Sequence, residues 1–411
     1  MDRKKTIIFI VVFILVVLIS IGIYSYFKNK NSGTLPSNPT LYDKFNPFGT
    51  GTTVAPKPGT TTTPEIPGIT TVGQTSRFYQ ITNFGVSGGA FLLDSRPVPE
   101  TTDPTTGEPI TVLAPAVRYA ERATGHIHEM FLDTKISGKI SNSTIPSVHE
   151  VIFGSDAKSA IYRYLADDNS ISSFLATLGG GSNFLTPDIL DISVSPDKGS
   201  FFTLVKTKTG VAGITKSFLE TKTKQVFISP FSEWLSQWPT DNSVYLTTKA
   251  SYLVAGSAFS LDIASGTMTK ILGGINGLTT LANYNGNLVL FGASLSRGPS
   301  LNIFDIKNHS STDLAIYGLP EKCVWSRDNI NIYCALPNTI MGTGYPDVWY
   351  QGLYSFTDYF VKINTKTRDI STLANSQNET PVDAIKPFLS NKEDKLFFTN
   401  KKDYTLWSLD L

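Results

Sequence analysis

Residues that hold metal ions or carry reactive chemistry are scarce in this sequence. Its 411 residues include only two cysteines, Cys323 and Cys334, and four histidines. No histidine pair lies near the cysteines in the sequence, which argues against a zinc site. His126 and His128 alternate along one predicted strand, but two ligands do not make a metal site, and an exposed polar strand face explains them better. We predict no metal and no cofactor.

Charge is also sparse. Charged residues make up 17% of the chain, and the formal net charge is +1. Binding to nucleic acid without sequence preference needs a broad basic surface, which this composition does not supply. The composition therefore excludes nucleic acid as an expected partner.

Two motifs of catalytic and phosphate-binding sites are missing. A serine hydrolase would need a Gly-x-Ser-x-Gly elbow on an α/β domain, and Gly256-Ser257 and Gly292-Ala293-Ser294 lack the second glycine. The run Gly179-Gly180-Gly181-Ser182 lacks the Gly-Lys-Ser/Thr ending of a phosphate loop. These patterns predict no catalytic residue.

One long apolar run is present, and it lies near the N-terminus. Residues 6–27 read TIIFIVVFILVVLISIGIYSYF, which contains no charged residue and is long enough to cross a bilayer. A cleaved signal peptide would have a shorter apolar region and a small-x-small cleavage site. Arg3, Lys4 and Lys5 precede the run, so the positive-inside rule places residues 1–5 in the cytoplasm. We predict a single-pass cell-membrane protein whose C-terminal domain is extracytoplasmic.

The segment after this run is rich in proline, threonine and glycine. Stretches such as Thr60-Thr61-Thr62-Thr63-Pro64 bury too little apolar surface to offset the entropy lost on ordering. We predict that residues 28–76 form a disordered linker to a folded domain over residues 77–411.

The remaining sequence repeats a unit of about 40 to 45 residues, the period of four-stranded propeller blades. The strands that align best begin at residues 160, 200, 243, 287, 331 and 395. Turns rich in Ser, Pro, Asp, Gly and Asn precede most of them, as in Ser195-Pro196-Asp197-Lys198-Gly199. Such side chains favour tight turns because they bond to the turn backbone.

This turn resembles the Ser-Pro-Asp-Gly-Lys turn of TolB-like and WD-repeat-like β-propellers, with lysine and glycine exchanged, although the Trp-Asp ending of WD repeats is absent. Residues 118–146, RYAERATGHIHEMFLDTKISGKISNSTIP, are similar to an uncharacterised family of membrane-anchored bacterial propellers. The resemblance implies an all-β propeller architecture and no particular activity.

Counting the units gives seven four-stranded blades, near residues 83–141, 145–183, 186–229, 231–272, 274–316, 318–375 and 380–411. The last unit is one strand short. Residues 77–82, RFYQIT, supply a spare strand before the first unit. We predict that this strand completes the last blade, because closure of the ring leaves no long open sheet edge.

Cys323 and Cys334 flank a predicted turn at residues 326–329. If Trp325 faces Ile332 across this hairpin, the two cysteines are opposite each other, close to the separation that a disulfide needs. An oxidising compartment would allow the bond. Two buried free thiols are the alternative.

Two insertions depart from the repeat. Residues 94–111 are polar and proline-rich, which predicts a loop. Residues 337–356 contain Tyr345, Trp349, Tyr350 and Tyr354, which we predict to form a binding loop, since aromatic side chains are common in contacts with proteins and glycans. The alternative is that these aromatics pack as a small core at the end of the ring.

These observations favour a protein- or glycan-binding or scaffolding module of the cell envelope. It would contact the membrane through its N-terminal helix and an envelope protein or a surface polymer through the propeller. The alternative is a cell-envelope enzyme, a glycan hydrolase or lyase, because two acids can meet in a propeller funnel from distant blades. A cluster of inward-pointing charged residues would favour the enzyme, and an apolar aromatic patch would favour binding.

Overall fold

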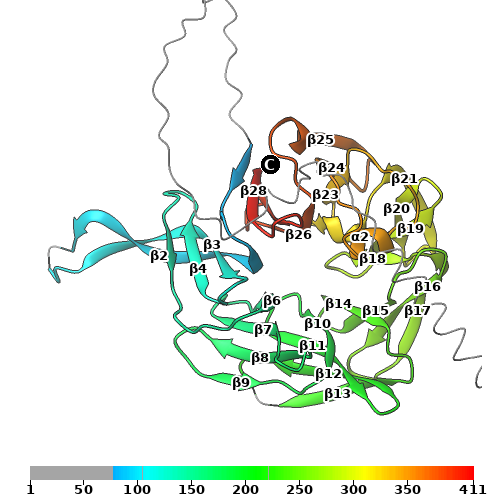
Figure 1. Ribbon diagram of the computed structural model, residues 1–411, viewed down its shortest axis with the longest axis horizontal. Helices are drawn as coiled ribbons and strands as arrows, with labels where there is room; N and C mark the ends of the chain where they lie inside the picture. Colours follow the sequence, from blue (N-terminus) through cyan, green and yellow to red (C-terminus); the bar gives the residue numbers. More distant parts are fainter. Residues whose placement is uncertain (1–76, 104, 221) are drawn as a thin grey trace, which may run out of the picture. The chain divides into compact units, whose positions relative to one another are not determined.

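The computed structural model describes residues 77–411 except residues 104 and 221. This part of the chain forms seven four-stranded antiparallel sheets that follow one another around a ring (Figure 1). The predicted all-β propeller of seven blades is therefore confirmed. The predicted anchor at residues 6–27 and linker at residues 28–76 lie outside the described residues. Within the described residues, no helix is long and apolar enough to cross a membrane.

The first three blades take their strands in chain order from the inside of the ring outwards (Figure 1). Blade 1 contains β2 (Val86–Thr102), β3 (Pro109–Glu121), β4 (Ile127–Phe131) and β5 (Ser137–Lys139). Blade 2 contains β6 (Val148–Phe153), β7 (Ser159–Leu165), β8 (Ile171–Thr177) and β9 (Ser182–Phe184). Blade 3 contains β10 (Ile189–Val194), β11 (Ser200–Thr207), β12 (Gly210–Ser217) and β13 (Thr223–Ser229).

The next three blades repeat this arrangement. Blade 4 contains β14 (Trp234–Thr240), β15 (Ser243–Thr248), β16 (Ala255–Asp262) and β17 (Met268–Asn276). Blade 5 contains β18 (Thr279–Ala282), β19 (Leu288–Leu295), β20 (Gly298–Asp305) and β21 (Ser310–Tyr317). Blade 6 begins after the 3-10 turn η2 (Pro320–Lys322) and contains β22 (Cys323–Trp325), β23 (Asn331–Pro337), β24 (Asp358–Asn364) and β25 (Ile370–Asn375). The helix α2 (Asp347–Tyr350) lies between β23 and β24, and a second 3-10 turn, η3 (Ser376–Asn378), follows β25.

Blade 7 joins the two ends of the described chain. It contains β26 (Ala384–Leu389), β27 (Lys395–Asn400) and β28 (Leu406–Asp410), and β1 (Phe78–Gln80) pairs with β28 as its outer strand. Arg77 adds hydrogen bonds to the carbonyls of Leu373 and Asp410, at 2.7 and 2.6 Å. The ring is thus closed by the N-terminal strand, as the count of units predicted.

The recurrent turns have a common local cause. In the turn before β11, the Asp197 carboxylate accepts hydrogen bonds from the Ser195 hydroxyl at 2.5 Å and from the Gly199 backbone N–H at 2.9 Å. Lys198 adopts a left-handed conformation, with φ of 55°. The Asp197 carboxylate therefore accepts a hydrogen bond that a backbone N–H of the turn would otherwise lack. This allows the chain to reverse between the first two strands of a blade.

The core lies between neighbouring blades. Buried apolar side chains from facing sheets form one cluster per interface, and the cluster between blades 3 and 4 includes Leu204, Val211, Val244 and Leu261. Alternate residues of a strand point to opposite faces, so each sheet contributes to the clusters on both of its sides. Burial of this kind between twisted sheets is what holds the ring together.

Residues 94–111 form a projection from blade 1. The sequence predicted a loop, whereas β2 and β3 continue as a paired ribbon in which Asp94 faces Ala114 and Thr102 faces Pro109. Figure 1 shows this ribbon extending away from the ring. The extended parts of β2 and β3 are close to each other in the sequence. Their hydrogen-bonded pairing satisfies backbone groups that an irregular loop would leave to solvent.

Candidate functional site

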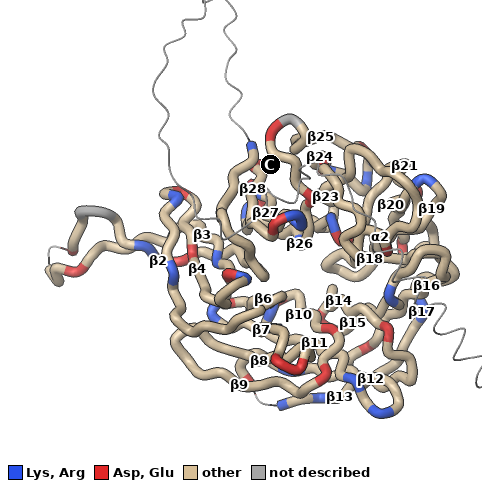
Figure 2. The backbone as a smooth tube through the Cα atoms, in the orientation of Figure 1, with Lys and Arg blue, Asp and Glu red and all other residues tan. Residues whose placement is uncertain are grey.

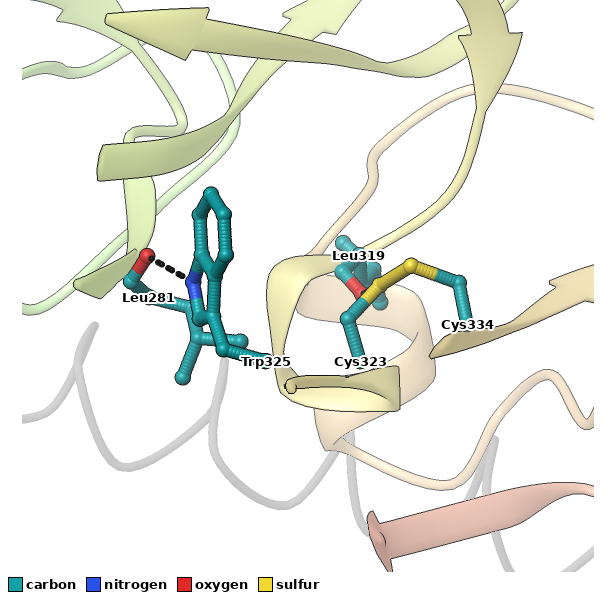
Figure 3. The surroundings of a disulfide bond; sticks show 5 residues. All are labelled: Leu281, Leu319, Cys323, Trp325 and Cys334. Carbon is teal, nitrogen blue, oxygen red and sulfur yellow. Dashed lines mark hydrogen bonds between the residues drawn. A yellow bond between two sulfur atoms is a disulfide. The ribbon is translucent and has the colours of Figure 1, made fainter. Parts of the chain in front are cut away.

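The two cysteines form a disulfide. Cys323 on β22 is directly opposite Cys334 on β23, and Trp325 is opposite Ile332, which confirms the predicted register. The sulfur atoms are bonded, and both residues are buried in the core between blades 5 and 6. Figure 3 shows the bond together with the Trp325 indole, which donates a hydrogen bond to the Leu281 carbonyl of blade 5 at 3.1 Å.

The four aromatics predicted to form a binding loop fall into two environments. Residues 337–356, called here the blade 6 insertion, leave β23 and return to β24. Within it, Tyr345 and Trp349 are 1% and 4% exposed and belong to a small apolar cluster, and Tyr354 is half-buried against them. Tyr350 is 42% exposed. The insertion therefore has a packed inner side, and Tyr350 lies on its outer side.

The inner side of the insertion is tied to two other blades by hydrogen bonds. Asp347 accepts from the Ser251 hydroxyl at 3.0 Å and the Tyr252 backbone N–H at 2.7 Å, both in the loop after β15 of blade 4. The Tyr345 carbonyl accepts from the Ser294 hydroxyl of blade 5 at 2.6 Å. The insertion thus lies over one face of the ring in a position fixed by several blades.

The outer side of the insertion presents large apolar side chains. Met341, Tyr350 and Leu353 are 62%, 42% and 73% exposed. Leu253 and Val254, in the blade 4 loop that is bonded to the insertion, are 67% and 57% exposed. We call these five side chains the exposed apolar group. Exposed apolar side chains on fixed loops are a feature of surfaces that contact other molecules.

A fully buried charge cluster lies beneath the insertion. Lys322, at the end of η2, places its Nζ 2.8 Å from Asp358 Oδ2 and 2.5 Å from Asp383 Oδ1. It also donates to the Ala384 carbonyl at 2.8 Å. Lys322 and both aspartates are 0% exposed. The sequence alone does not predict this cluster, because Lys322 ends η2, Asp358 begins β24 and Asp383 precedes β26, far apart in the chain.

The aspartates connect the cluster to the insertion. Asp383 accepts hydrogen bonds from Trp349 Nε1 at 3.0 Å, Ser355 Oγ at 3.1 Å and the Phe356 backbone N–H at 2.9 Å. Burial raises the pKa of Asp358 to about 6, against the opposing charge of Lys322. Since a substrate could not reach groups without exposed surface, this cluster serves to hold the insertion in place.

A second charge cluster lies on the inner strands. Glu150 on β6 is 3.0 Å from Arg163 Nη1 and 2.6 Å from Lys386 Nζ on β26. Gly88, on the inner strand β2 of blade 1, packs closely against the same strand β6. A side chain there is impossible, because its Cβ would lie 2.0 Å from the Val151 carbonyl oxygen of β6. Burial alone would raise the pKa of Glu150, but Lys386 and Arg163 outweigh it and lower the pKa to about 2.

A second acid of the inner strands lies close to this cluster. Asp191 on β10 accepts hydrogen bonds from the Ser236 backbone N–H at 2.5 Å and from its hydroxyl at 2.8 Å. Burial raises the pKa of Asp191, and the charge of Glu150 adds to this. Figure 2 shows acidic and basic residues interspersed around the ring. Glu150 and Asp191 therefore both contact residues of other strands. The pKa of Glu150 is lowered, and the pKa of Asp191 is raised.

One histidine lies beside the second charge cluster, since His149 Nδ1 is 2.9 Å from the Arg163 carbonyl oxygen, whereas His126 and His128 lie in blade 1. The ring of His128 stacks on Tyr119 with 5.7 Å between centroids, and its Nε2 is 3.6 Å from Glu121. His126 Nε2 is 3.0 Å from the Thr144 hydroxyl. Within residues 77–411, apart from the two undescribed positions, no three metal-binding side chains converge.

Comparisons with known proteins show the fold and nothing finer. No family model matches the chain, and no curated protein matches it. Among solved structures, an oligogalacturonate lyase in complex with manganese is 10% identical, with a TM-score of 0.50 over 80% of this chain and 98% of that one. An oligogalacturonate lyase from Vibrio parahaemolyticus is 10% identical, with a TM-score of 0.50 over 78% of this chain and 98% of that one. TolB from Acinetobacter baumannii is 11% identical over 79% of this chain and 80% of that one, with a TM-score of 0.40. The chain thus shares the β-propeller fold of the two oligogalacturonate lyases.

Proposed function

We propose that this protein is a membrane-anchored binding module of the cell envelope, which contacts an envelope protein or a surface glycan through the exposed apolar group. The observation that carries this proposal is the two-sided blade 6 insertion. Its inner side is fixed by Asp347, Trp349 and the buried charge cluster, while its outer side presents Met341, Tyr350 and Leu353.

Fixing the insertion before contact favours binding. A loop that is already ordered loses little conformational entropy when a partner arrives, so more of the contact energy appears as affinity. Tyrosine is also among the residues enriched at the positions that dominate the binding energy of protein contacts, and Tyr350 belongs to the exposed apolar group. Four hydrogen bonds join Asp347, Tyr345 and Trp349 to residues outside the insertion, and in one of them Trp349 donates to Asp383. They therefore support a recognition surface better than a flexible cover.

The anchor and the compartment are part of the same proposal. The uncharged run at residues 6–27 supports a single span, and the basic residues before it support an extracytoplasmic propeller. The Cys323–Cys334 disulfide supports an oxidising compartment, since such bonds are rare in the cytoplasm.

The test uses site-specific crosslinking in cells that produce the full chain. A photoreactive amino acid replaces Leu353, and the matched control replaces Leu219, an equally apolar side chain that is 85% exposed in the turn after β12. We expect a discrete crosslinked product from position 353 and none from position 219. Equal products, or none from either position, would contradict the proposal. A protein product is separated from a glycan product by protease and glycosidase digestion.

A second candidate function is a glycan hydrolase or lyase, which the inner acids support. Glu150 is held ionised while burial raises the pKa of Asp191, and opposite shifts of two nearby acids suit a base and an acid in one site. A panel of uronate-containing and neutral polysaccharides should then be degraded by the full chain but not by its Glu150→Gln variant. Absence of degradation by the unmodified chain rejects this candidate and leaves the binding proposal untouched.

A further inference from the structure

An interblade cavity of about 610 Å³ lies between blades 1 and 2, outside the regions considered so far. Its floor is formed by Ile127 of blade 1 and by Phe153, Ala160, Tyr162 and Phe174 of blade 2, all of which are buried. This volume is within the range of sites that hold small organic molecules, about 300 to 1,000 Å³. Protein interiors otherwise leave few voids larger than a water molecule.

The cavity exists because blade 2 has two alanines where other blades have larger side chains. Ala160 on β7 is directly opposite Ala176 on β8, and both line the cavity. The residues at the same place in blades 3 to 7 are the pairs Phe201 and Lys216, Val244 and Leu261, Val289 and Phe304, Ile332 and Ile363, and Leu396 and Leu409. In those blades the first member of each pair packs against the preceding blade. In blade 2 the corresponding space is left open.

The cavity is roofed by the connection between blades 1 and 2. The Ile145 backbone N–H donates to the Thr124 carbonyl at 2.7 Å, and the Thr144 hydroxyl is 3.0 Å from His126 Nε2. Gly125 permits this approach, because its φ is 70° and a Cβ there would lie 2.9 Å from the Ile145 carbonyl oxygen. The roof is therefore bonded to blade 1 and does not fill the space beneath it.

The side chains of the floor favour an apolar ligand. Tyr162 and Phe174 stack with 4.9 Å between ring centroids, and burial raises the pKa of Tyr162 to about 12. The polar lining residues Ser141, Asn142, Ser143 and Thr144 belong to the roof, and Tyr162 supplies the one hydroxyl of the floor. A sugar placed on the floor would bury its other hydroxyl groups against Ile127, Phe153 and Phe174, which offer no hydrogen-bonding side chain. Burying a hydroxyl without a partner is costly, so a hydrocarbon chain fits this floor better than a saccharide.

The rim has one charged residue, and it is basic. Lys158 is exposed beside the turn at residues 179–182, where the Leu178 backbone N–H donates to the Lys158 carbonyl at 2.8 Å. The carboxylate of Asp156 on the same turn accepts from the backbone N–H groups of Lys158 and Ser159, each at 2.9 Å, and does not line the cavity. No carboxylate is among the lining residues. An anionic head would therefore meet a positive charge at the rim.

We infer that the interblade cavity binds a fatty acid, with its alkyl chain on the floor between Ala160 and Phe174 and its carboxylate near Lys158. This goes beyond the proposed contact at the blade 6 insertion, since no lining residue of the cavity belongs to that insertion. The two sites can consequently fail or succeed independently.

The test labels the full chain in membrane vesicles with a dodecanoate that carries a diazirine on its alkyl chain. Mass spectrometry should locate the label on peptides that contain Ile127 or Phe174. The variant with Ala160→Leu and Ala176→Leu fills the floor, and its labelling there should fall about tenfold or more, which corresponds to a loss of only about 1.4 kcal/mol in affinity. Ala176→Leu alone is a second variant, because Ala176 is only half-buried and tolerates the change more readily. Thermal melts of both variants check that the fold is intact.

Competition experiments identify the head group of the ligand and show whether its alkyl chain comes from a free fatty acid or from a phospholipid. Unlabelled dodecanoate should displace the label better than its methyl ester. Lys158→Gln should remove this preference, whereas Lys208→Gln, at an exposed lysine after β11, should keep it. The inference is overturned if the label maps outside the cavity or if the filled variant is labelled like the unmodified chain. It is also overturned if a neutral oligosaccharide competes as well as dodecanoate, or if a photoreactive phosphatidylglycerol labels the floor more strongly.

Discussion

Replacing Lys322 by methionine tests whether the buried charge cluster stabilises the ring. The Lys322 ammonium contacts Asp358, Asp383 and the Ala384 carbonyl, all within 2.8 Å, and the lysine and both aspartates are 0% exposed. Methionine keeps most of the side-chain length and the apolar contact with its surroundings. The change therefore removes the charge and leaves the packing volume nearly as it was.

The expected loss of stability depends on the hydrogen bonds that the two aspartates keep in the Lys322→Met variant. Asp383 retains its bonds from Trp349, Ser355 and Phe356, whereas Asp358 retains only the Ala384 backbone N–H at 2.7 Å. Breaking a buried ion pair by removing one partner costs about 3 to 5 kcal/mol, because the remaining charge is uncompensated. We expect the free energy of unfolding to fall by this amount, with most of the effect from Asp358.

Urea denaturation of the full chain near neutral pH measures the change. Adding Asp358→Asn to Lys322→Met should restore part of the lost stability, since it removes the uncompensated carboxylate. The matched control is Lys249→Met, which breaks an ion pair with Glu233 whose side chains are 45% and 56% exposed. Exposed pairs contribute about 0 to 1 kcal/mol. If Lys322→Met costs no more than Lys249→Met, the buried cluster does not stabilise the fold as argued.

Three further predictions concern the same domain. Thiol titration of denatured, unreduced protein should find no free thiol, and reduction of the Cys323–Cys334 bond should lower the free energy of unfolding by at most about 2 to 3 kcal/mol, because its loop is short; two free thiols would refute the bond. Deleting residues 77–82 exposes the edge of β28, so the melting temperature should fall and the protein should aggregate on size exclusion; an unchanged melt would refute the role of ring closure. Because burial raises the folded-state pKa of Asp358 to about 6, its contribution to stability is complete below its ordinary pKa of 3.8 and is lost as the pH rises through 6. Asp358→Asn should therefore flatten the dependence of stability on pH between these values, as urea titrations across that range would show.

The fold could be predicted because its information is local and repeated. Each blade contains its own turns, and a turn such as Ser195 to Gly199 is stabilised by side chains within the same few residues. The disulfide could be predicted for a similar reason. The short hairpin between β22 and β23 fixes which residues face each other, so Cys323 and Cys334 meet as soon as the register is known.

The charge clusters could not be predicted in this way. Lys322 ends η2, Asp358 begins β24 and Asp383 precedes β26. The three meet only after blades 6 and 7 are placed side by side. Glu150 and Lys386 are 236 residues apart, and they contact each other only because the ring is closed. No spacing in the sequence identifies such pairs, since each depends on how the blades are rotated relative to one another.

The interblade cavity could be predicted from the sequence only in part. The small residue at Ala160 is visible in the sequence once the repeats are aligned, because Phe201, Val244 and Ile332 occupy the same strand position. A small residue alone does not predict a cavity, since the neighbouring blade can fill the space with a larger side chain. Here blade 1 contributes small residues to the same interface, among them Ala90 and Ala120. A search of aligned blades for small residues on both sides of one interface would therefore select candidate cavities without coordinates.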